Sequence, residues 1–469
     1  MFERRARSEE QSELWVKAGE LPSATPDAFY RRVNATLEKI DFAREVWAIC
    51  EPAYAQPSRG GRPGIDPVVY LKMLTVGFFE NLPSERAIAS RCADSLSIRG
   101  YLGYSLTEAT PDHSSLSVIR ERLSIEQLEA IHRVLLRALR EHGLLRGRKL
   151  GIDSSVIEAN ASLRALEHRN SEQSYWDYVR ALAAEAGIDP DDAKAVRRFD
   201  RQREGRKTSN REWHNPHDPE AKVGRTKDGA CDMIYKPEHI SDLESGAIIR
   251  AEVRPGDAAD NDESLCERVM AAVGTLSEVA PEEPLEKLGV ELGADEGYFA
   301  IEPIAQLQAC GVRTVIADPQ RARRTSTRMS QEHRSALRRA SRATRSASGK
   351  ALLRLRGEHL ERGFCHVLDH GGQRRAHLRG CPKLTKRHVC AALGHNLSLL
   401  LRHLFGTGTP KQALAMAGQA LLRLTVWLRG LIALLPSVCI CIRPRRLDLY
   451  PPARFQFSPA RLKRFSTGC

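Results

Sequence analysis

The segment Lys149-Leu150-Gly151-Ile152-Asp153 marks the point where helical spacing gives way to a strand-like pattern. A short apolar run that ends in an acid is typical of a buried strand. A second such run, Leu288-Gly289-Val290-Glu291-Leu292, leads into Gly293-Ala294-Asp295. Ligands of open α/β sheets gather at the carboxyl ends of the strands. We therefore expect Asp153 and Asp295 to lie at one edge of one sheet.

The residues around these two runs predict the rest of that sheet. Strand patterns over 233–240 and 247–253 flank a tight turn at 243–246, which is typical of a hairpin. The pattern then predicts a helix over 264–279, a helix over 301–308 and a strand over 312–317. This order favours a mixed α/β sheet, antiparallel at one edge and parallel elsewhere, with flanking helices.

The front half of the chain has helical spacing throughout. Residues 1–51 form a first predicted segment, and a stretch rich in Pro, Gly and Ser over 52–67 indicates a linker. Further short helices follow, with Ser84 and either Asp112 or Ser114 as N-caps. Short helices joined by tight breaks are typical of a helix-turn-helix unit and equally of any small helical bundle.

Two other regions complete the predicted organisation. Residues 161–230 are polar with little periodicity, which indicates a partly ordered insertion. Within it, Trp213 either packs in its own domain, which we favour, or stacks on a DNA base. A helix is predicted over 386–405, and the apolar stretch 413–438 indicates an amphipathic or buried helix because Arg423 and Arg429 interrupt it.

Composition narrows the partners. The chain has 72 Lys and Arg against 59 Asp and Glu, a formal net charge of +13. Such a balance favours nucleic acid before anionic membrane, although a GC-rich genome also enriches Arg. The 11 cysteines form no CxxC pair, which argues against a zinc site or a disulfide framework. Residues 1–7 precede no apolar run, so we expect no signal peptide and a cytoplasmic protein.

The most basic tract lies between residues 319 and 356. It is either a solvated helix face or a phosphate-binding surface, and we favour phosphate contact because little acid offsets it. The residues that we assign to DNA binding are Arg321, Arg323, Arg324, Arg338, Arg339 and Arg342.

Carboxylates from separate elements are what phosphodiester chemistry needs. Two divalent ions can activate the attacking oxygen and stabilise the leaving oxygen, and hard cations prefer carboxylate ligands. A carboxylate from a downstream helix would complete the pair formed by Asp153 and Asp295.

Motifs that follow one another in the family's order along residues 15–405 resemble the DDE transposases of bacterial insertion sequences. The segment 151–160 resembles their first-aspartate strand, and 293–298 resembles the second-aspartate motif. The segment 360–380 resembles the third-acid region, and Asn396-Leu397 matches the helix that follows it. Gly61-Arg62-Pro63, Asp66-Pro67 and 111–114 resemble the helical InsH-type N-terminal domain.

The resemblance implies a ribonuclease-H-like catalytic core preceded by an all-α domain. It makes Asp153, Asp295 and Glu361 the catalytic and metal-binding acids, with two Mg²⁺ ions or Mn²⁺ as cofactor. The residues four before and seven after Glu361 are Gly357 and Leu368, where related enzymes carry helper basic residues, and Glu358 is a rival third acid.

The expected activity is cleavage at terminal inverted repeats and strand transfer into target DNA, by a homodimer or larger assembly on double-stranded DNA, with no membrane partner. The alternatives are a nuclease on the same core that does not join DNA, and a catalytically silent DNA-binding remnant or regulator. The expected domains are 1–51, 62–140, 147–405 with its insertion at 161–230, and a helical and basic tail at 406–469.

Overall fold

The fold was analysed in a computed structural model, which describes residues 25–54, 64–169, 173–203, 209–282, 289–320 and 329–434. By its internal contacts the chain divides between Ala417 and Gly418. All elements that build the candidate site lie in the first unit, and the domain boundaries expected from sequence stay a prediction.

The helices of the front half begin at residues that cap them. Asp66, Ser84 and Asp112 each accept a hydrogen bond from a backbone N–H in the first turn, as the sequence predicts for Ser84, and Asp112 is the cap of the two alternatives Asp112 and Ser114. Each such cap stabilises a helix by about 1 kcal/mol. The helices are α1 (Thr25–Lys39), α2 (Phe42–Tyr54), α3 (Pro67–Phe79), α4 (Glu85–Asp94), α5 (Leu96–Leu102), α6 (His113–Arg122) and α7 (Ile125–Glu141).

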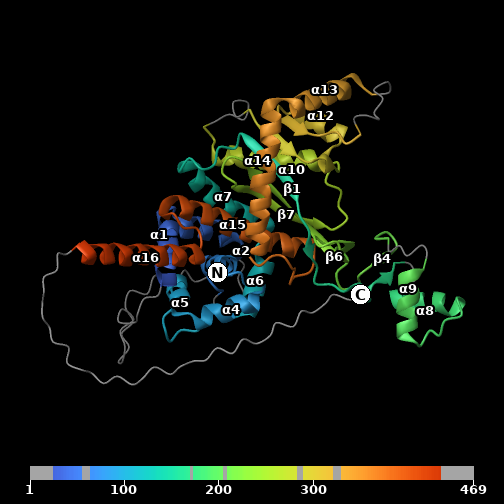
Figure 1. The fold of residues 1–469 in the computed structure, drawn as a ribbon, viewed down its shortest axis with the longest axis horizontal. Helices are drawn as coiled ribbons and strands as arrows, with labels where there is room; N and C mark the ends of the chain where they lie inside the picture. The colour runs from blue at the N-terminus through green and yellow to red at the C-terminus, as the bar shows by residue number, and fades with distance from the viewer. Residues whose placement is uncertain are drawn as a thin grey trace. The chain divides into compact units, whose positions relative to one another are not determined.

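The predicted mixed sheet is present (Figure 1). Strand β6 (Cys231–Asp242) pairs antiparallel with β7 (Ile248–Pro255) and with β1 (Lys149–Ser154). Strand β1 pairs parallel with β8 (Glu291–Ala294), which pairs parallel with β9 (Arg313–Ile316). Two short strands, β2 (Ile157–Glu158) and β5 (Lys222–Arg225), extend the far end of β6.

Side chains alternate between the two faces of this sheet, as strand geometry requires. Leu150 and Ile152 of β1 lie in one apolar cluster with helices α7, α10 (Leu265–Val279) and α12 (Ile301–Ala309). The opposite face carries Gly151 and Asp153. The parallel partner β8 repeats this arrangement, with Leu292 and Ala294 in the same cluster and Gly293 on the opposite face.

Helix α14 (Ala347–Phe364) covers that opposite face and contacts β9, β8, β1 and β6 (Figure 1). Its apolar residues Leu352 and Leu360 face the sheet and are almost fully buried. A Cβ on Gly151 would lie 2.5 Å from the side chain of Leu243 and 3.0 Å from that of Leu360. The glycine therefore permits the close approach of the helix. Helix α13 (Gln331–Arg345) precedes α14.

Helix α15 (Cys381–Phe405) connects the sheet to the front half. It packs against β7 on one side and against α3 and α7 on another. A single apolar cluster consequently includes residues of α1 to α7, of β7 and of α15. Beyond it, α16 (Pro410–Leu434) covers most of the predicted apolar helix. The predicted helix is thus present, and its Leu421 and Trp427 are 63% and 61% exposed.

The insertion has more structure than its sequence indicated. It contains α8 (Tyr175–Glu185), α9 (Ala193–Gln202) and the short pair β3 (Glu167–His168) and β4 (Trp213–His214). Each helix begins at a residue whose side-chain oxygen accepts a hydrogen bond from a backbone N–H of the first turn, Ser174 for α8 and Asp192 for α9. Trp213 is buried against the rings of Tyr175 and Tyr178, which confirms the packing role.

In the part of the chain that the structure describes, no helix has the length and apolar character needed to span a membrane.

Asn396 is the polar joint between α15 and its neighbours. Its amide accepts from Ile248 N at 2.9 Å and donates to Ile248 O at 2.8 Å, and its Nδ2 lies 2.8 Å from His132 Nε2.

Replacement of Asn396 by Ala would leave these buried backbone and histidine groups without a hydrogen-bond partner, and it should lower the free energy of unfolding by about 2–4 kcal/mol. We expect a correspondingly lower midpoint in urea unfolding for Asn396→Ala. Lys383 is half-exposed on the same helix, so Lys383→Ala should lower the free energy of unfolding by less than about 1 kcal/mol. Equal shifts would contradict this role.

Candidate functional site

Asp153 and Asp295 meet at the carboxyl edge of the sheet, as the sequence predicts. The parallel register pairs Gly151 with Gly293, so the aspartates two residues further on lie beside each other. Asp153 Oδ1 accepts from the backbone N–H of Ser154 at 2.9 Å. Asp295 Oδ1 accepts from Gly297 N at 2.9 Å and caps a short 3-10 turn, Glu296–Tyr298. Both carboxylates are thus oriented by the backbone.

Arg356 of α14 joins the two aspartates. It lies four residues from both Leu352 and Leu360, on the helix stripe that faces the sheet. Its Nη2 is 2.7 Å from Asp153 Oδ2 and 3.6 Å from Asp295 Oδ2. One cationic nitrogen therefore lies against both carboxylates.

Burial makes the charge on Asp153 costly. Its side chain is 20% exposed, whereas that of Asp295 is 46% exposed. Burial raises the pKa of Asp153 to about 6, although the charge of Arg356 and the Ser154 N–H act in the opposite direction. The nearby Asp295 adds to the increase. The charge of Asp153 is consequently sensitive to its surroundings.

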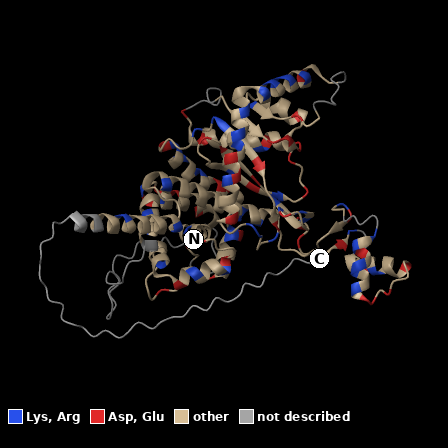
Figure 2. Cartoon of the chain, in the orientation of Figure 1, with Lys and Arg blue, Asp and Glu red and all other residues tan. Residues whose placement is uncertain are grey.

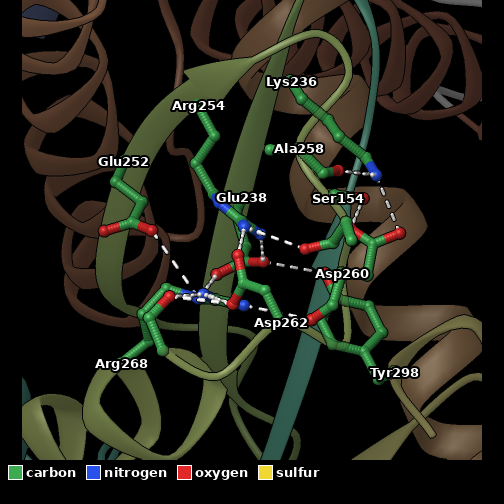
Figure 3. A network of polar contacts seen from close by, with 12 residues as sticks. Ser154, Lys236, Glu238, Glu252, Arg254, Ala258, Asp260, Asp262, Arg268 and Tyr298 are labelled. Carbon is green, nitrogen blue, oxygen red and sulfur yellow. Dashed lines mark hydrogen bonds and ion pairs between the residues drawn. The ribbon is translucent and has the colours of Figure 1, made fainter. Parts of the chain in front are cut away.

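A buried ionic network supports the turn that carries Asp295 (Figure 3). The Tyr298 hydroxyl donates to Glu238 Oε2 at 3.0 Å. Glu238 also pairs with Arg268 at 2.7 Å and Arg254 at 3.2 Å, and Asp262 pairs with both arginines. Because these charges are desolvated and mutually paired, loss of one partner would be strongly destabilising.

A third aspartate lies close to the pair. Asp260 accepts from Ser154 Oγ at 3.0 Å and pairs with Lys236 at 2.8 Å (Figure 3). A Cβ on Gly297 would lie 3.1 Å from Asp295 and 3.7 Å from Asp260. Asp260 therefore links the end of β1 to the Asp295 turn.

The predicted third acid lies on α14 but is not gathered with the aspartates. Glu361 is exposed and lies five residues after Arg356, which faces the aspartates. Residues five apart on an α-helix differ by about 140° in direction, so Glu361 points away from the pair. Its rival Glu358 is also exposed and pairs with Arg362 at 2.7 Å. Among the residues described, no three His, Cys, Asp or Glu side chains form a group that could hold a metal ion. The assignment of Glu361 stays a prediction.

The aspartate pair itself fits a cation. Asp153 Oδ2 and Asp295 Oδ2 both face one positively charged atom, Arg356 Nη2, so the two carboxylates together present oxygens to a single cation. Oxygen ligands of this kind suit Mg²⁺ or Mn²⁺. Asp153 and Asp295 would hold such an ion, and further ligands would have to come from elsewhere.

A basic groove begins beside the Asp295 turn. It has a volume of about 780 Å³ and runs from Phe299 and the end of β9 to α13. Arg338, Arg342 and Arg345 line it, and Figure 2 shows the concentration of basic residues on α13. Arg339 instead bonds to Gln308 at 2.6 Å and Ser335 at 2.9 Å. Arg321, Arg323 and Arg324 lie outside the described residues.

Sequence reasoning missed Arg356 and Asp260. Arg356 had a signal, since it interrupts an apolar stripe at positions 352, 356 and 360 of a helical pattern. Asp260 had none, because it lies in a loop and its partners Ser154 and Lys236 are distant in sequence.

Residues 21–122 match the family model described as Transposase domain (DUF772). This match supports a transposase. No curated protein matches the chain. A solved structure, "Crystal structure of a pre-cleavage Mos1 transpososome", aligns with 67% of this chain and 82% of that chain, at 12% identity and a TM-score of 0.19.

Asp153→Asn should stabilise the ion-free protein at neutral pH. The pKa of Asp153 is higher folded than unfolded, so the free energy of unfolding falls as pH rises from about 4 to about 6. Asparagine carries no charge to bury. We therefore expect the free energy of unfolding of Asp153→Asn to exceed that of the wild type by about 1–2 kcal/mol above pH 6, and the difference to vanish near pH 4. Urea unfolding in EDTA across this range measures it. A gain independent of pH would contradict the assigned cause.

Proposed function

We propose that this protein is a DDE-type transposase that cleaves DNA at transposon inverted repeats and joins the ends to target DNA. The observation that carries the proposal is the convergence of Asp153 and Asp295 on one cationic position at the carboxyl edge of the sheet. The transposase-domain match over residues 21–122 supports the same class independently.

The strand order supports a ribonuclease-H-like core. Three antiparallel strands, β7, β6 and β1, are followed by two parallel strands, β8 and β9. The first proposed acid ends β1, and the second follows β8 directly. This arrangement brings acids that are distant in sequence to one edge, as DNA strand transfer by a single site requires.

The proposed substrate is double-stranded DNA bound along the basic groove. Arg338, Arg342 and Arg345 would contact phosphates, which fix position without reading sequence. Asp153 and Asp295 would hold divalent ions, which supply activation of the attacking oxygen and stabilisation of the leaving oxygen. Asp260 and Tyr298 keep the aspartates in place through Ser154 and Glu238.

Two other functions predict different results in a joining assay. A nuclease on the same core would cut labelled end DNA without joining it to a target. A silent DNA-binding remnant would bind DNA and do neither. The closeness of Asp153 and Asp295 favours an enzyme over the remnant.

Asp295→Asn tests the chemistry directly. It preserves size but removes the charge that a hard cation requires. We expect DNA-end binding to persist while nicking and joining in Mg²⁺ both fall by orders of magnitude, because one site serves both steps. Normal nicking by this variant would overturn the catalytic assignment.

The third acid is tested by a matched pair on one exposed helix surface. Glu361→Gln should abolish nicking and joining, whereas Glu358→Gln, whose carboxylate pairs with Arg362, should keep most activity. The reverse result would move the third acid to Glu358 and leave the aspartates unaffected.

The groove is tested by salt dependence. Arg338→Gln with Arg342→Gln should weaken DNA binding and reduce the slope of log K against log salt by about one unit for each lost phosphate contact. Arg339→Gln is the matched control, because its guanidinium is engaged with Gln308. Equal effects in both variants would argue against binding in the groove.

A further inference from the structure

The position between the two aspartates is already taken by Arg356. Its Nη2 is 2.7 Å from Asp153 Oδ2, so a divalent ion bound to both carboxylates at about 2.1 Å could not share that space. Two positive charges at such separation would also repel each other strongly in a half-buried site. Arg356 and a bridging ion are therefore mutually exclusive.

Arg356 is only partly satisfied in this arrangement. Its contact with Asp295 is 3.6 Å, beyond hydrogen-bond length. Its Nε is buried and finds no hydrogen-bond partner among the described residues. By contrast, Arg254 of the neighbouring network pairs with both Glu238 and Asp262. An arginine that leaves a buried donor unpaired has free energy to gain from another set of acceptors.

A phosphate would offer those acceptors. The guanidinium fork matches phosphate oxygens in a two-point geometry, and the basic groove that would bring DNA begins at Phe299, four residues beyond Asp295. We infer that Arg356 keeps the aspartate pair closed to divalent ions until a DNA phosphate draws its guanidinium away. This inference rests on the proposed function and adds a step of control to it.

The test measures metal binding without catalysis. Mn²⁺ affinity is determined by titration calorimetry for the full chain, free of DNA, as wild type, Arg356→Gln and Arg356→Lys. We expect Arg356→Gln to bind Mn²⁺ at least tenfold more tightly than wild type. Arg356→Lys keeps the competing charge and should stay close to wild type. Adding Asp153→Asn to Arg356→Gln should abolish the gain, which assigns it to this pair.

A second measurement follows the arginine to DNA. In EDTA, Arg356→Gln should bind a labelled 40-bp duplex several-fold more weakly, with a salt slope lower by about one unit. A purely structural arginine would leave that slope unchanged. Thermal unfolding of each variant in EDTA confirms that it is folded, and Arg356→Lys provides the comparison where Arg356→Gln is unstable.

The outcomes separate this inference from the proposed function. If Arg356→Gln binds Mn²⁺ no more tightly than wild type, or if its salt slope is unchanged, the inference is overturned. The proposed metal site survives that result if wild type binds Mn²⁺ in a manner that Asp153→Asn abolishes. If no variant binds Mn²⁺, both the inference and the proposed metal site fail.

Discussion

The close contact of α14 with β1 and β8 is the constraint on which the candidate site depends. It requires a residue without a side chain at Gly151, where any Cβ would meet Leu243 and Leu360. With the helix seated there, the side chain of Arg356 reaches the end of both strands. The parallel register then sets Asp153 beside Asp295. The helix contact positions Arg356, and the strand register positions the two aspartates that it meets.

The second requirement is that two like charges stay together. Two neighbouring carboxylates repel each other, and burial adds to the cost for Asp153. Arg356 offsets part of this cost from one side. From the other, the Glu238 network fixes Tyr298 and the Asp260 contact fixes Ser154, so the backbone beside each aspartate cannot relax away. The two carboxylates therefore stay close because the groups around them hold the neighbouring backbone in place.

Local pattern was sufficient for most of the sheet and for the position of Asp153 and Asp295 at one edge of it. The β1 and β8 runs, the hairpin and the caps at Ser84 and Asp112 depend on neighbours within a few residues, and the structure has them where the sequence predicts. The short helices α8 and α9 were missed because each buries only a narrow stripe, at positions such as Val179 and Val196, within a stretch that is polar as a whole.

Contacts between distant residues were beyond reach of the sequence. Arg356 belongs to the site because it contacts Asp153 and Asp295. Both aspartates are far from it in sequence, and no spacing rule relates the three positions. The same holds for Asp260 and its partners. The predicted triad came from resemblance to a family, and only its two strand-borne members are tied to each other by the sheet register.

The place of Glu361 follows from the same helix. Turning α14 rigidly by about 140° to bring Glu361 over the aspartates would carry Leu352 and Leu360 out of the core. Exposing each leucine costs about 2 kcal/mol, so such a rotation is disfavoured. A carboxylate from this helix can join the pair only through the reach of its own side chain or through a local change of helical register. A change of helical register is present directly after α14, because the helix continues into a π-helical turn at Cys365–Asp369. A register change there would alter the direction of the last turn of α14 while leaving Leu352 and Arg356 seated on the sheet.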